Sequence, residues 1–155
     1  CQIGLSQSKA HRQFVNELWA AHDTLKGEKR ASVLISLAKQ YSSFNLDSAK
    51  ILLRLAVSKP EIDSLVETKA DLFNSLGIVS YMAGQNDSAL FYYQRALETN
   101  LSIHNEIGIA RNYSNLANVY FAKAETYLAL ESYLEAENHA LAAGDSNTLS
   151  DESVF

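Results

Sequence analysis

Few residues of this chain have the types and the spacing that catalysis or metal binding requires. The four histidines show no metal-ligand spacing with one another or with acidic pairs, and we expect them to be solvated, as we expect for Glu131, Glu135 and Glu137. The single cysteine excludes an internal disulfide and a thiolate zinc site. No glycine-rich phosphate loop occurs, and no serine lies in a nucleophile elbow. The sequence therefore predicts no enzyme, no metal site and no cofactor. The histidines are His11, His22, His104 and His139.

The elements that could present a binding surface are indicated by a repeat of small residues. In three places a leucine and a small residue are followed, 12 or 13 residues later, by two alanines that lie seven residues apart. A period of about 40 residues made of two helical segments is typical of stacked helical hairpins, which present a surface rather than a cleft. The three copies are Leu37-Ala38 with Ala49 and Ala56, Leu76-Gly77 with Ala89 and Ala96, and Leu116-Ala117 with Ala129 and Ala136.

This spacing has a physical reason in the close packing of two antiparallel helices. The small residue after each leading leucine leaves room for the partner helix, and alanines seven residues apart lie on one helix face. We expect Leu53, Tyr93 and Tyr133 to fill the space between the layers. Because Gly77 marks a close contact, a large residue there should disrupt the middle hairpin.

Several signals predict where the helices begin and end. Residues 64–67 (Ser-Leu-Val-Glu) have the form of a capping box, which would open a helix running to about Ala83. Asn86 and Asn105 can cap the next two helices. Gly144-Asp145 should end the last hairpin.

A further helix is predicted before the first repeat. Between Ser8 and Ala21 the apolar residues Phe14, Leu18 and Trp19 recur at helical spacing. We expect this helix to pack on the first hairpin, with Trp19 as a core residue. The sequence thus predicts seven helices and no β-sheet.

These residues resemble the tetratricopeptide repeat (TPR) family, and the middle copy is the most similar. The last copy has Ala124-Glu125-Thr126 where the family favours Gly-Asp-aromatic, and the first copy is the most degenerate. The resemblance implies an all-α fold, in which an N-terminal helix and three antiparallel hairpins stack as a right-handed superhelix (an α-solenoid). The domain would cover residues 8–143, with repeats at about 30–58, 65–100 and 106–143. The matching residues of the middle copy are Phe73, Leu76-Gly77, Tyr81, Gly84-Gln85-Asn86, Ala89, Tyr92-Tyr93 and Ala96-Leu97.

In that family the first helix of each hairpin lines the concave side and contacts peptides or partner helices. The resemblance therefore implies a concave face on which asparagines hydrogen-bond a peptide backbone and aromatic and methionine side chains hold apolar groups. The alternative is that these residues pack against the N-terminal helix or another helix. The face would comprise Ile35, Lys39 and Ser42 in the first copy, Asp71, Asn74, Ile78, Tyr81 and Met82 in the second, and Arg111, Ser114, Asn118 and Phe121 in the third.

The two ends of the chain leave alternatives open. The start of the chain has three alternative interpretations. Cys1 would be the acylated first residue of a mature lipoprotein, or Gly4-Leu5-Ser6 would be the cleavage site of a secretory signal. In the third interpretation the sequence simply starts at an arbitrary position. Residues 1–7 would accordingly be a signal or lipoprotein remnant or a tail. The first two interpretations imply an extracytoplasmic protein, periplasmic or membrane-anchored, and the third leaves a cytoplasmic one. Residues 144–155 would be a tail or the start of a truncated further repeat.

Composition limits the partners. A net charge of −5 disfavours nucleic acid, and no apolar run is long enough to span a membrane. We expect a protein or peptide partner, self-association through open repeat ends, and membrane contact only through an N-terminal anchor or segments beyond this sequence.

A second resemblance concerns the setting of the domain. An N-terminal helix, a degenerate first repeat with Leu46-Asp47-Ser48-Ala49 and repeats of about 40 residues are similar to exported sensory regions of certain bacterial histidine kinases and transcription regulators. This resemblance implies an interaction module, the sensory or scaffolding part of a larger bacterial signal-transduction protein. The alternative is a free-standing exported scaffold or assembly lipoprotein.

Overall fold

The computed structural model describes residues 16, 20, 25–42, 45–58 and 60–151. Within this part of the chain there are six α-helices, one 3-10 helix and no β-strand, so the all-α prediction is confirmed for these residues. The helices are α2 (Gly27–Ser42), α3 (Leu46–Val57), the 3-10 helix η1 (Pro60–Ser64), α4 (Val66–Met82), α5 (Asn86–Ser102), α6 (Glu106–Ala122) and α7 (Thr126–Asp151).

The chain divides into two compact units, Cys1–Thr68 and Lys69–Phe155. In the first unit, α2 packs against α3 and against η1. Asn45 caps α3, since its Oδ1 accepts the backbone N–H of Ser48 at 2.9 Å. The predicted N-terminal helix with Trp19 lies outside the described residues, apart from two helical positions at 16 and 20. The core of this unit is formed by Leu34, Leu37, Ala49, Leu52, Leu53, Ala56 and Ile62, each at most 3% exposed.

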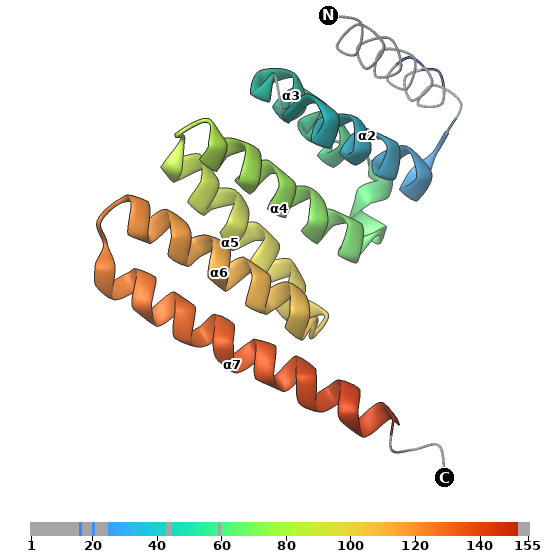
Figure 1. The fold of residues 1–155 in the computed structure, drawn as a ribbon. Helices are drawn as coiled ribbons and strands as arrows, with labels where there is room; N and C mark the ends of the chain where they lie inside the picture. The colour runs from blue at the N-terminus through green and yellow to red at the C-terminus, as the bar shows by residue number, and fades with distance from the viewer. Residues whose placement is uncertain (1–15, 17–19, 21–24, 43–44, 59, 152–155) are drawn as a thin grey trace, which may run out of the picture. The chain divides into compact units, whose positions relative to one another are not determined.

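In the second unit, α4, α5, α6 and α7 run alternately in opposite directions (Figure 1). α5 packs on α6 and α6 packs on α7, while Gly77 of α4 lies against Tyr93 of α5. Each of α4, α5 and α6 has 17 residues, and a three-residue turn follows each of them. The helices therefore begin every 20 residues, which is half of the 40-residue repeat seen in the sequence.

The three turns of this unit share one backbone conformation. Gly84, His104 and Ala124 have φ values of 71°, 53° and 60°, in the left-handed region that ends many helices. The next residue donates its backbone N–H to a carbonyl five residues earlier, as in a Schellman motif. These bonds run from Gln85 to Ser80 at 2.9 Å, from Asn105 to Asn100 at 3.0 Å and from Glu125 to Tyr120 at 2.9 Å.

The predicted helix starts are partly correct. Asn105 caps α6, because its Oδ1 accepts a backbone N–H at 3.0 Å. Asn86 does not cap α5 but is its first residue, and the capping position belongs to Gln85, which makes no side-chain capping bond. Ser64 is the last residue of η1, and α4 begins at Val66, one residue later than the predicted capping box would place it.

The small residues lie where the repeat predicted them. Ala89 and Ala96 are fully buried, and a Cβ at Gly77 would overlap the ring of Tyr93. Tyr93 fills its interlayer space at 2% exposure, and burial raises the pKa of its hydroxyl. Tyr133, expected in the same role, is 42% exposed. The reason is that α6 covers Tyr93, whereas no helix follows α7 among the described residues.

The last helix is longer than the sequence suggested. α7 continues through Gly144 and Asp145 to Asp151, so this dipeptide does not end the hairpin. A glycine inside a helix costs only about 1 kcal/mol relative to alanine and keeps its backbone hydrogen bonds, which is too little to end a helix.

Replacing Gly77 with alanine should lower the free energy of unfolding by about 1–3 kcal/mol, because the added methyl would overlap the buried ring of Tyr93. Gly77→Leu should lower it further. Gly144→Ala is the matched control, since this glycine also lies inside a helix but has nothing within 4 Å of the added methyl. There alanine should raise the free energy of unfolding by about 0.5–1 kcal/mol. Urea denaturation measures both, and equal effects would contradict the close contact.

Replacing Ala124 with glycine should stabilise the fold by about 1 kcal/mol, because glycine adopts its positive φ without the steric cost of a Cβ. Ala140→Gly serves as the control. Ala140 is exposed inside α7, where the same change should destabilise by about 0.5–1 kcal/mol. Thermal denaturation compares the two, and a lower melting temperature for Ala124→Gly than for the parent would contradict the strain.

Candidate functional site

Most of the predicted site residues lie on a surface shared by α4 and α6. Arg111 and Asp71, which are both exposed, join the two helices through an ion pair of 3.5 Å. Tyr81 is 37% exposed, and Phe121, its counterpart 40 residues later, is 68% exposed. We call this surface the α4/α6 face. It comprises Asp71, Ile78, Tyr81 and Met82 from α4 and Arg111, Ser114, Asn118 and Phe121 from α6.

Sequence reasoning missed one apolar residue of this surface. Ile107, which is 56% exposed, precedes Arg111 by four residues and Ser114 by seven, so it lies on the same side of α6. Its counterpart on α4 is Glu67, which is also exposed. Helical spacing counted backwards from Arg111 would have found it.

Asn74 has a different role from the predicted one. It is only 8% exposed, and its Oδ1 accepts hydrogen bonds from Nδ2 of Asn115 at 2.8 Å and from Nδ2 of Asn112 at 3.2 Å. A buried carbonyl with two donors is satisfied within the protein and is not offered to a peptide. Asn74 therefore fastens α4 to α6 beneath the α4/α6 face.

These bonds continue into a chain of asparagine side chains. Nδ2 of Asn100, at the end of α5, donates to Oδ1 of Asn112 at 2.7 Å. Nδ2 of Asn105 donates in turn to Oδ1 of Asn100 at 3.1 Å, while Asn105 also caps α6. We call Asn74, Asn100, Asn105, Asn112 and Asn115 the asparagine network. A Cβ at Gly108 would approach the amide of Asn100 to 2.5 Å, so the network also explains this glycine.

The remaining predicted site residues lie on two different helices, α6 and α2. Asn118 is exposed, and its Oδ1 accepts a hydrogen bond from the Tyr133 hydroxyl at 2.7 Å. Ile35 and Ser42 are half-buried on α2, which belongs to the first unit. Lys39 also lies on α2, and its side chain is outside the described part of the structure.

One histidine is not solvated as expected. Nδ1 of His139 lies 2.6 Å from Oε2 of Glu106, and its ring stacks on Tyr113 with a centroid distance of 5.7 Å. Burial raises the pKa of Tyr113, and the carboxylates of Glu135 and Glu131 raise it further. His104 is exposed in its turn, whereas His11 and His22 lie outside the described residues. The His139–Glu106 pair fastens α7 to α6.

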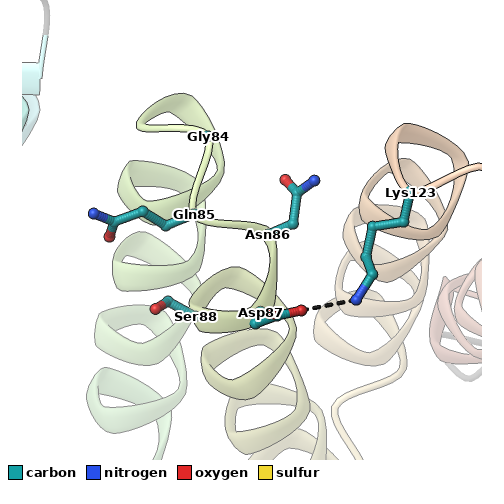
Figure 2. Close-up of a pocket in the computed structure, with 6 residues that line it drawn as sticks. All are labelled: Gly84, Gln85, Asn86, Asp87, Ser88 and Lys123. Atoms are coloured by element: carbon teal, nitrogen blue, oxygen red, sulfur yellow. Dashed lines mark hydrogen bonds and ion pairs between the residues drawn. The ribbon is translucent and has the colours of Figure 1, made fainter.

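A polar depression lies at the turn between α4 and α5 (Figure 2). Lys123 reaches it from the end of α6 and donates to Asp87 at 2.7 Å. This hydrogen bond is the main cause that raises the pKa of Lys123. The depression is lined by Gly84, Gln85, Asn86, Asp87, Ser88 and Lys123.

Two features are absent from the described residues. Across these residues no three His, Cys, Asp or Glu side chains gather in a way that could hold a metal ion. None of the helices described here has the length and apolar character needed to cross a membrane.

Replacing Asn112 with alanine should lower the free energy of unfolding by about 1–3 kcal/mol, since it leaves the buried amide of Asn100 without its acceptor. Asn118→Ala is the matched control, because this exposed asparagine loses only a solvent-accessible bond and should change stability by about 0.5 kcal/mol or less. Chemical denaturation measures both. Equal stabilities of the two variants would contradict the importance of the network.

No family model matches the chain, and no curated protein matches it. Among solved structures it is similar to the crystal structure of BtubC (BKLC) from P. vanneervenii, with a TM-score of 0.69 and 20% sequence identity. The match covers 76% of this chain and 49% of that one, so the chain spans about half the length of that structure. At this identity the similarity shows a shared helical fold.

Proposed function

We propose that this chain is a protein-interaction module and that the α4/α6 face binds a peptide or a helix of a partner protein. The observation that carries the proposal is the pair Tyr81 and Phe121, two exposed aromatic rings at the same position of two helices 40 residues apart. Aromatic side chains are favoured at interfaces because they supply a large contact area at a small cost in conformational entropy.

The chemistry of the α4/α6 face defines the segment that would fit. Ile78 and Met82 are 39% and 54% exposed beside Tyr81, so the α4 part can hold apolar side chains of the partner. The α6 part adds the amide of Asn118 and the charge of Arg111, which can hydrogen-bond a backbone or a carboxylate. We expect an affinity near the micromolar range, about −8 kcal/mol, because an extended segment loses entropy when it binds.

The arrangement of the hairpins and the kind of protein that contains them are also proposals. We propose that the hairpins form a right-handed superhelix of the TPR type, with the α4/α6 face on its concave side. The constant 20-residue helix spacing and the identical turns support this, since equal units related by equal turns generate a regular stack. We further propose that this module is the sensory or scaffolding part of a larger bacterial signalling protein.

A selection of phage-displayed random peptides against the whole chain tests the binding face. Peptides selected on the parent should bind the double variant Tyr81→Ala plus Phe121→Ala at least tenfold more weakly, a loss of about 1.4 kcal/mol or more. Phe91→Ala is the matched control, because Phe91 is 52% exposed on α5, away from the α4/α6 face. Circular dichroism verifies that each variant is folded. Peptides that bind the folded double variant as tightly as the parent would refute the proposal.

A further inference from the structure

The side of α7 that faces away from α6 carries a row of exposed apolar side chains. Ala129, Ser132 and Ala136 of α7 are buried at 2%, 8% and 7% exposure, so the opposite side of this helix faces solvent. Spacings of three, four and seven residues place four large apolar residues along that side. We call them the α7 stripe: Tyr127 (76% exposed), Leu130 (58%), Leu134 (52%) and Leu141 (63%).

The repeat accounts for Leu130 and Leu141 of the α7 stripe but not for Tyr127 and Leu134. α5 holds the equivalent place 40 residues earlier, and at the positions of Tyr127 and Leu134 it carries Asp87 and Gln94, both exposed and polar. The counterpart of Leu130 on α5 is Leu90, which packs with Tyr93 against α6, and the counterpart of Leu141 is Leu101, which is exposed. A further hairpin stacked in the same way would cover Tyr133 and Leu130 and leave Tyr127 and Leu134 in water. An exposed apolar row of this kind marks an interaction site.

The charges beside the α7 stripe indicate the character of its partner. Glu131 and Glu137 are exposed and lie on opposite sides of the stripe, and the sequence of α7 contains no lysine or arginine. Two copies packed antiparallel about Leu134 would place the two Glu131 side chains along one border and the two Glu137 side chains along the other, and these like charges oppose a homodimer. A helix whose apolar stripe is bordered by cations would pair with both carboxylates.

We propose that the α7 stripe docks an amphipathic helix of a partner protein, with lysine or arginine on both borders of its apolar residues. This goes beyond the proposed function, because it assigns a second surface, on another helix, to a partner of different character. The α4/α6 face combines aromatic rings with amides and Arg111, whereas the α7 stripe combines leucines with glutamates.

Two synthetic peptides test the proposal. Both are amphipathic helices of about 20 residues, long enough to be partly helical, with the same leucine stripe. One has lysine and the other glutamate on the borders. In fluorescence anisotropy the lysine peptide should bind the whole chain at least tenfold more tightly than the glutamate peptide, and added salt should reduce this difference. The double variant Leu130→Gln plus Leu134→Gln should bind the lysine peptide at least tenfold more weakly than the parent.

Matched controls separate this site from other surfaces. Leu101→Gln changes an exposed leucine of α5 (43%), and Tyr81→Ala plus Phe121→Ala alters the α4/α6 face, so neither should change binding of the lysine peptide. Weaker binding by either control, or equal binding of the two peptides, would overturn the proposal. So would light scattering that shows a dimer of the parent and a monomer of the Leu130→Gln plus Leu134→Gln variant, because a second copy would then occupy the stripe. Circular dichroism verifies the fold of every variant.

Discussion

A buried amide must find hydrogen-bond partners, and the second unit meets this requirement with side chains from different helices. Asn74 on α4, Asn100 at the end of α5 and Asn112 on α6 are each at most 8% exposed, and each depends on the others. A core of alanine and leucine alone tolerates sliding and repacking. The asparagine network does not, because a shift by one helical turn would leave several polar atoms without partners. It therefore fixes the register of three helices on which the α4/α6 face depends.

The turn geometry and the network support each other. Asn100 supplies its carbonyl to the turn that ends α5 and its side chain to the network, so one residue serves the backbone and the core. Gly108 leaves the space that its amide needs. The same turn recurs at Gly84, His104 and Ala124, although only the first is a glycine. Packing and hydrogen bonds around the other two must offset about 1–2 kcal/mol of steric cost at each.

The hairpins could be predicted from the sequence because close helix contacts demand small residues, and Gly77 lies at such a contact. The network could not be predicted in the same way. Asparagine is usually exposed, and the partners Asn74 and Asn112 lie 38 residues apart with no local pattern to link them. The sequence consequently predicts Asn74 on the surface that we propose for binding, where Tyr81 and Phe121 are exposed. The sequence predicts too early an end for α7, because glycine weakens a helix without ending it.

α7 lies outside the asparagine network and packs on α6. Of its side chains whose burial is described, only Ala129, Ser132 and Ala136 are buried, and an element with few buried contacts opens at a lower free energy than the rest of a fold. The amide protons of α7 would therefore exchange with solvent through local opening, while α4, α5 and α6 open together as one cooperative unit. Opening of α7 would break the pair of His139 with Glu106. A ligand that binds only the closed helix would suppress this motion by mass action.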